Sequence, residues 1–130
     1  MTGQPLYWLN QIQTDSHHQV GDKAFYLGLA HQQGYPVLPG FVISHDLFRD
    51  FLEQINWGGA FLADFPHSSL HLDVDNPQQL RAIAHQIQRA IWDTPFPEEW
   101  QDMILNAAHL LPPSALLICR PSMSLASGSD

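Results

Sequence analysis

Apolar residues recur at helical spacing in four segments of the chain, and we expect each of these segments to form a helix. The clearest repeat lies between residues 78 and 92, where apolar side chains fall three or four positions apart. Gly34 follows the first segment and Ser44 opens the second, and these residue types commonly end and begin helices. The expected helices are 23–33, 44–55 with Ser44 as the N-cap, 78–92 and 98–110.

Two short apolar runs indicate strands between these helices. The run Phe41–Ile43 follows a segment rich in proline and glycine, and the run 114–119 follows Pro112-Pro113. Near the N-terminus we expect a small apolar anchor made of Tyr7, Trp8, Leu9 and Ile12. The pattern predicts an α/β fold, or an α+β fold, in which a small sheet of short strands is covered by about four helices.

The length of 130 residues fits a single domain. Within it we expect residues 1–19 to form an N-terminal extension and residues 121–130 a flexible tail, because that tail is small and polar.

The charge balance argues against a nucleic-acid partner. Five basic residues oppose thirteen acidic ones and give a net charge of −8, and no basic patch is present to neutralise a phosphate backbone. No apolar stretch approaches the length of a membrane span, and the N-terminus lacks the features of a signal peptide. A single cysteine, Cys119, fits a reducing compartment and lies in an apolar run. We therefore expect a cytoplasmic protein without membrane contact, with Cys119 in the core.

The sequence Gly21-Asp22-Lys23 stands at the start of the first expected helix and is a candidate phosphate site. The first amides of a helix have no intrahelical partner, and the helix dipole favours negative charge beside them. A lysine on the first turn adds a positive charge. The commoner alternative is a surface helix in which Asp22 caps the amides itself and Lys23 is solvated.

Arg120 is a second candidate, because it follows an apolar run and precedes Pro121 and Ser122. The ends of strands in α/β proteins often face ligand crevices, where an arginine can hold a phosphate through two hydrogen bonds. The alternative is an arginine that pairs with one of the many acidic side chains. Neither candidate is specific by itself.

Taken together, these segments resemble the nucleotide-binding domain of the pyruvate phosphate dikinase and phosphoenolpyruvate synthase family. Residues 20–28 read VGDKAFYLG, similar to the family's Val-Gly-Gly-Lys-Ala…Leu-Gly opening. Residues 34–44 read GYPVLPGFVIS, similar to its Gly-x-Pro-Val-Pro-Pro-Gly-Phe-Val-Ile-Thr segment, which is the most specific part. Residues 117–122 read LICRPS, similar to its Val-Arg-Ser-Ser strand end. The likeness covers about residues 8–124 in the family's order.

The resemblance implies the first lobe of an ATP-grasp-type domain, which holds ATP and passes a phosphoryl group to a histidine on another domain. By this resemblance, Lys23 and Arg120 are expected to contact the phosphates of ATP, together with Gly21 and Ser122. Such transfer depends mainly on positioning and charge neutralisation. Mg²⁺ would accompany ATP in the complete enzyme. The family's magnesium carboxylates, adenine pocket and phosphorylated histidine have no counterpart in these residues, so we expect no catalytic residue, no metal ligand and no tightly bound cofactor in this chain.

The chain departs from the family pattern at the expected phosphate contacts. Asp22 stands where the family has its second glycine, which places a carboxylate beside the phosphate. Pro121 stands where the family has a serine, which removes an amide donor and a hydroxyl. Two hypotheses therefore stay open. The chain is the N-terminal ATP-binding lobe of a phosphotransferase and incomplete on its own, or it is a stand-alone degenerate lobe that serves as a non-catalytic binding or regulatory module.

The resemblance also makes geometric predictions. Lys23 and Arg120 should open onto one face, which the remaining ATP-grasp lobe or another protein would cover. Phe41–Ile43 should share a sheet with residues 116–118. The helix 78–92 should cover that sheet and bury the apolar side chains Leu80, Ile83, Ile87 and Ile91.

A metal site is a weaker candidate. His67 and His71 have the i, i+4 spacing of metal ligands on a helix, and Asp73 and Asp75 lie nearby. Pro66 disfavours a helix at this point. An exposed polar segment is the preferred interpretation.

Overall fold

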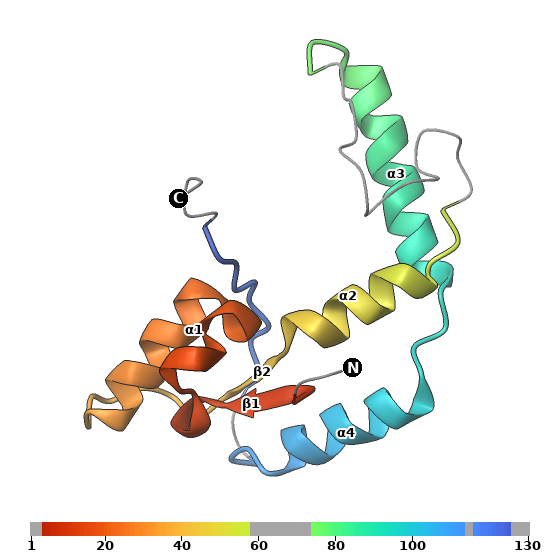
Figure 1. Cartoon of the computed structure of the whole chain (residues 1–130). Coiled ribbons are helices and arrows are strands. Elements are labelled where there is room, and N and C mark those ends of the chain that lie inside the picture. The colour runs from red at the N-terminus through yellow and green to blue at the C-terminus, as the bar shows by residue number, and fades with distance from the viewer. Residues whose placement is uncertain (1–3, 58–73, 114–115, 126–130) are drawn as a thin grey trace. The chain divides into compact units, whose positions relative to one another are not determined.

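The computed structural model describes residues 4–57, 74–113 and 116–125. Within these ranges the chain forms four α-helices and one two-stranded antiparallel sheet, which confirms the small α/β-type fold (Figure 1). The chain divides into two compact units. The first contains Met1–Arg49 and Glu98–Asp130, and the second contains Asp50–Pro97. None of the described helices is long and apolar enough to cross a membrane.

The sheet of the first unit pairs strand β1 (Leu6–Trp8) with strand β2 (Phe41–Ile43). Leu6 lies opposite Ile43, and the rings of Trp8 and Phe41 meet edge to face with centroids 5.3 Å apart. Such cross-strand pairs are the main source of stability in a short sheet. The sequence predicted β2 but gave no strand at β1.

The core of the first unit lies between this sheet and the first helix. It contains three of the residues expected to form an N-terminal anchor, which confirms that prediction in part, since Trp8 is only half-buried. The buried members are Tyr7, Leu9, Ile12, Val20, Ala24 and Phe25.

Helix α1 (His17–Gln32) starts earlier than predicted, because one helical turn precedes a break at Gly21. Two short 3₁₀ turns, η1 (Leu9–Gln11) and η2 (Thr14–Ser16), lead into it. The side-chain amide of Gln32 donates to the carbonyl oxygens of Leu9 and Ile12, at 3.2 and 2.8 Å, and so holds the η1 segment against α1.

The end of α1 follows the sequence prediction. Gly34 has φ 91, and its amide donates to the carbonyl of His31 while the amide of Tyr35 donates to that of Ala30. This pair of bonds is a Schellman motif, which requires a left-handed residue and therefore favours glycine.

Helix α2 (His45–Gln54) is capped as predicted. The Ser44 hydroxyl accepts a hydrogen bond from the Leu47 amide at 3.2 Å, and Ser44 is fully buried. Asp46 in the first turn is buried and forms an ion pair with Arg49 at 3.3 Å. The boundary between the two units falls within this helix.

The second unit contains helix α3 (Pro77–Asp93), close to the predicted bounds. Asn76 caps it by accepting from the Gln79 amide at 3.2 Å, with Pro77 at the first helical position. The expected burial of its apolar stripe is only partly correct: Ile83 is buried, whereas Ile91 is 40% exposed. Whether α3 covers the sheet, which belongs to the other unit, stays a prediction.

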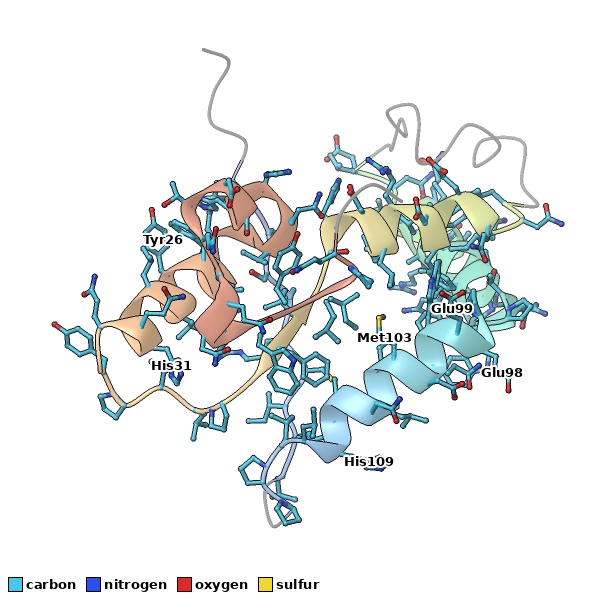
Figure 2. All side chains as sticks on the ribbon, turned by 60° about the horizontal axis from the view of Figure 1, so that its bottom comes forward. Tyr26, His31, Glu98, Glu99, Met103 and His109 are labelled. Atoms are coloured by element: carbon cyan, nitrogen blue, oxygen red, sulfur yellow. The ribbon has the colours of Figure 1, made fainter. Side chains whose placement is uncertain are left out.

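Helix α4 (Glu98–His109) returns to the first unit and also matches its predicted position. Glu98 and Glu99 lie in its first turn, where their negative charge complements the helix dipole, and His109 lies in its last turn. Figure 2 shows these side chains at opposite ends of the helix, with Met103 between them.

The described residues of the segment 114–119 do not form the strand that the sequence predicted. Residues 116–119 have no regular secondary structure, and the sheet consists of β1 and β2 in the described part of the chain. Leu116 is 95% exposed and Cys119 is also exposed, so Cys119 is not a core residue. An apolar run becomes a strand only where another strand accepts its backbone hydrogen bonds. Among the described residues β2 pairs with β1 instead.

Candidate functional site

Gly21 divides α1 into two helical segments. Its backbone angles, φ 81 and ψ 167, lie in a region that essentially only glycine adopts. The longer segment therefore begins at Asp22, which places the amides of a helix N-terminus at the Gly21-Asp22-Lys23 motif that the sequence singled out.

Residues 122–125, here called the strap, lie against this N-terminus (Figure 1). The Asp22 amide donates to the Met123 carbonyl and the Ala24 amide donates to the Ser122 hydroxyl, both at 3.0 Å. The same hydroxyl donates to the Val20 carbonyl at 2.6 Å. Ser122 therefore caps both sides of the break in α1, across about a hundred positions of sequence.

The contact between Gly21 and the strap depends on the missing side chain. A Cβ atom at this position would lie 2.4 Å from the Ser122 carbonyl oxygen and 2.7 Å from its hydroxyl oxygen. Gly21 thus serves two purposes, because it permits the break in the helix and lets the strap backbone approach.

The Asp22 carboxylate contacts the strap with one oxygen and His17 with the other. One carboxylate oxygen accepts from the Leu125 amide at 3.1 Å, and the other lies 2.7 Å from the His17 ring nitrogen Nε2. The Leu125 hydrogen bond, and then the His17 contact, lower the pKa of Asp22 below its ordinary value. The His17 ring in turn stacks on Phe25 with centroids 4.0 Å apart. Asp22 is therefore an ionised group that is held in place.

Lys23 and Arg120 are both exposed, and neither forms an ion pair with any described residue. Arg120 lies two positions before Ser122, so its backbone is within about 7 Å of a residue bonded to the Lys23 turn. The structure thus brings the two candidate segments together. The Lys23 turn and the Arg120 segment thus meet at one helix N-terminus, where the ionised Asp22 carboxylate offsets part of the positive charge.

Metal ligands do not gather at this site. No group of three or more histidine, cysteine or acidic residues capable of holding a metal ion occurs in the described ranges. Near the helix N-terminus the available donors are Asp22 and His17, which contact each other. The candidate pair His67 and His71 lies outside the described residues.

Sequence reasoning missed two features of this site. It did not identify His17, because five positions separate it from Asp22 and this spacing carries no recognisable pattern. It also treated the strap as a tail, although Ser122 was a candidate. A single serine in a segment without helical spacing gives no local sign of the helix that it caps.

Comparison with known proteins assigns the chain to a family. Residues 17–125 match the model of the pyruvate phosphate dikinase AMP/ATP-binding domain. A relative in Staphylothermus marinus, called probable phosphoenolpyruvate synthase, is 30% identical over 100 residues, which is 76% of this chain. The chain corresponds to 11% of that relative's length. No solved structure matches the chain.

The matched range contains the whole candidate site, from His17 and the break at Gly21 through to Leu125. The resemblance noted in the residues around Lys23 and Arg120 is thereby confirmed at the level of the family. This chain belongs to the family of pyruvate phosphate dikinase AMP/ATP-binding domains.

Proposed function

We propose that this chain is the ATP-binding lobe of a phosphotransferase similar to phosphoenolpyruvate synthase, and that Lys23 and Arg120 hold the phosphates of ATP. The observation that carries the proposal is the hydrogen bond between the Ser122 hydroxyl and the Ala24 amide. It joins the Arg120 segment to the Lys23 turn at a helix N-terminus, where amides and helix dipole favour an anion.

Gly21 and Ser122 complete the proposed site. Gly21 has no side chain to keep the Ser122 backbone away, and the Ser122 hydroxyl accepts from the Ala24 amide. Positive charge and oriented donors are what phosphoryl transfer mainly requires of a protein. Mg²⁺ would then arrive with the nucleotide or be held by residues elsewhere, since Asp22 and His17 already occupy each other.

The proposed partner is the remainder of an ATP-grasp domain, or another protein, lying across the face that bears Lys23 and Arg120. Large apolar side chains on the C-terminal segment support this, because isolated protein surfaces rarely present so many together. These are Leu116, Leu117, Ile118, Met123 and Leu125, which are 60–95% exposed. A cytoplasmic location belongs to the same proposal and is supported by the single cysteine.

Titration of the ¹⁵N-labelled chain with ATP, followed by amide chemical shifts, tests the phosphate site. We expect a dissociation constant of about 1 mM or weaker, because the net charge of −8 repels ATP. The shifts should centre on the Lys23 turn and on residues 120–122. Lys23→Ala and Arg120→Ala should each weaken binding about tenfold or more, since a hydrogen bond to a charged group is worth about 1.5–3 kcal/mol.

The matched controls are Arg81→Ala and Arg89→Ala on α3, which change the net charge equally but belong to the second unit. They should leave the affinity within about twofold, because neither arginine belongs to the two segments of the proposed site. Adenosine should cause no shifts at the Lys23 turn. Equal weakening by all four variants, or equal binding of adenosine and ATP, would contradict the proposal.

A second function, a non-catalytic binding or regulatory module, is favoured by a separate observation. The amides of Asp22 and Ala24 at the helix N-terminus already donate to the strap, and the Asp22 carboxylate holds the end of the strap. If ATP causes no shifts in any variant, the module is the better description.

A further inference from the structure

The position of Arg120 depends on the strap that follows it in the chain. Arg120 is exposed and forms no ion pair with the described acidic side chains. Pro121 fixes its own φ and restricts the residue before it to extended backbone, so Arg120 is joined to Ser122 by a stiff link. The contacts that hold Ser122 therefore also place the backbone of Arg120.

The strap is held against α1 by four hydrogen bonds among the described residues and by little apolar burial. The side chains of Met123 and Leu125 are 72% and 80% exposed. Three of the bonds involve Ser122 or Met123 and lie beside the break in α1. The fourth runs from the Leu125 amide to the Asp22 carboxylate and holds the far end of the strap. Its acceptor is ionised, which makes it the strongest type of hydrogen bond among the four.

His17 aligns the Asp22 carboxylate for this contact. The second carboxylate oxygen lies 2.7 Å from the His17 ring nitrogen Nε2, and the His17 ring stacks on Phe25, which belongs to the core. Asp22 thus connects the end of the strap to a fixed part of the first unit. Because the strap buries so little apolar surface, loss of this connection should let it leave α1 at a small free-energy cost.

The cationic side chains carry most of the proposed phosphate binding. The amides of Asp22 and Ala24 donate to strap atoms, and each carries one hydrogen, so these two amides are not available to a phosphate oxygen. Lys23 lies on α1 itself, whereas Arg120 is brought to the same place only by the docked strap. The affinity for phosphates should therefore depend on how firmly the strap is held.

We propose that Asp22 is a positioning residue for the phosphate site: its hold on the Leu125 amide keeps the strap docked on α1, and the docked strap keeps Arg120 beside the Lys23 turn. The inference rests on the proposed function and gives Asp22 no contact with ATP. The charge of the carboxylate opposes an incoming phosphate, while its contact with the strap supports binding. Removal of the charge alone should strengthen binding, and removal of the contact should weaken it.

Asp22→Asn and Asp22→Ala separate these two effects, because both change the net charge equally. Asparagine keeps an oxygen that accepts from the Leu125 amide and adds an NH₂ group that donates to an unprotonated His17 nitrogen, whereas alanine keeps neither contact. The first readout needs no nucleotide and is hydrogen exchange at the Ala24 amide, which donates to Ser122. We expect exchange about tenfold faster in Asp22→Ala than in Asp22→Asn. The Gly28 amide within α1 should exchange equally in both, which excludes global unfolding as the cause.

The second readout is the titration with ATP, followed by amide chemical shifts. If the strap of Asp22→Ala is docked about one-tenth of the time, its apparent affinity is about tenfold lower than that of Asp22→Asn. ATP should still shift the Lys23 turn of Asp22→Ala, while the shifts at residues 120–122 are largely lost. A substitution that only destabilised the fold would weaken both sets of shifts together.

The outcomes separate the positioning role from the phosphate site. Equal exchange at the Ala24 amide in the two variants overturns the inference, whatever the nucleotide does. Equal ATP affinity in the two variants also overturns it, while a loss of binding in Arg120→Ala would still support the phosphate site. Absence of ATP binding by the natural chain overturns the proposed function and the inference together.

Discussion

The backbone of Gly21 and the carboxylate of Asp22 determine most of the local structure at the candidate site. Gly21 adopts angles that other residues avoid, and the strap backbone lies where its Cβ would be. Asp22 takes the position of a glycine in the family pattern and joins the strap to His17. Both effects are testable by single substitutions.

Gly21→Ala should destabilise the first unit more than Gly34→Ala. Both glycines have positive φ, and a side chain in that region costs about 1–2 kcal/mol. A Cβ at Gly21 would also clash with backbone atoms of Ser122, whereas a Cβ at Gly34 would have no atom within 4 Å. The clash should add about 1–3 kcal/mol. Urea denaturation of both variants measures the difference, and equal free energies of unfolding would refute the close approach of the strap.

Asp22 should make stability depend on pH in the acidic range. Its pKa is lower in the folded chain than its ordinary value of 3.8, so its stabilising contribution is fully present above that value. The contribution disappears as the pH falls through the lower, folded pKa. The groups facing the carboxylate are the Leu125 amide and the His17 ring.

The measurement compares the free energy of unfolding of the natural chain with that of Asp22→Asn from pH 5 downward. The difference should shrink as the pH falls below 3.8. Asp15→Asn serves as the control and should show a smaller change. A difference that stays constant to pH 2 would mean that the carboxylate is not held as described.

At the scale of the elements, local residue types predicted where helices begin and end, but they did not predict which strands pair. Ser44, Asn76 and Gly34 each occupy the capping position that their side-chain or backbone chemistry suits. The run 114–119 carries an equally clear apolar pattern, yet its described residues are not in a strand. Capping is completed within a few residues, whereas a strand requires a partner from elsewhere in the chain.

Ser44→Ala should destabilise the protein more than Asn76→Ala. Both changes remove the acceptor for an N-terminal amide, at a typical cost of about 1 kcal/mol. Ser44 is fully buried, so no water replaces its hydroxyl at the Leu47 amide. The Asn76 cap is exposed, and water can take its place. Thermal unfolding by circular dichroism distinguishes them, and an equal loss in both variants would argue that the Ser44 cap is accessible.

At the scale of the molecule, the proposed phosphate site lacks, among the described residues, the groups that activate a phosphoryl transfer. Lys23 and Arg120 are exposed, and the described residues offer no cluster of three metal ligands. Catalysis of this kind needs the metal and the exclusion of water in addition to positive charge.

The purified 130-residue chain should therefore show neither ATP hydrolysis nor phosphoryl transfer to pyruvate. The measurement is release of inorganic phosphate at high protein concentration with Mg²⁺, together with an assay for phosphoenolpyruvate. The control is Lys23→Ala under the same conditions. Turnover in the natural chain that this substitution abolishes would show that the site is complete.

The sequence by itself determined the family, four helices with most of their ends, and the two segments of the candidate site. These depend on residue types at short spacing, such as the motif around Lys23 and the caps at Ser44 and Gly34. Only the tertiary structure decided that Leu6–Trp8 pairs with Phe41–Ile43, that Cys119 is exposed and that Ser122 caps α1. The strand pairs and the Ser122 cap join residues that are 33 or more positions apart, and Cys119 is exposed because no described strand pairs with its segment. Local chemistry fixes where an element begins, but competition among distant segments fixes what it touches.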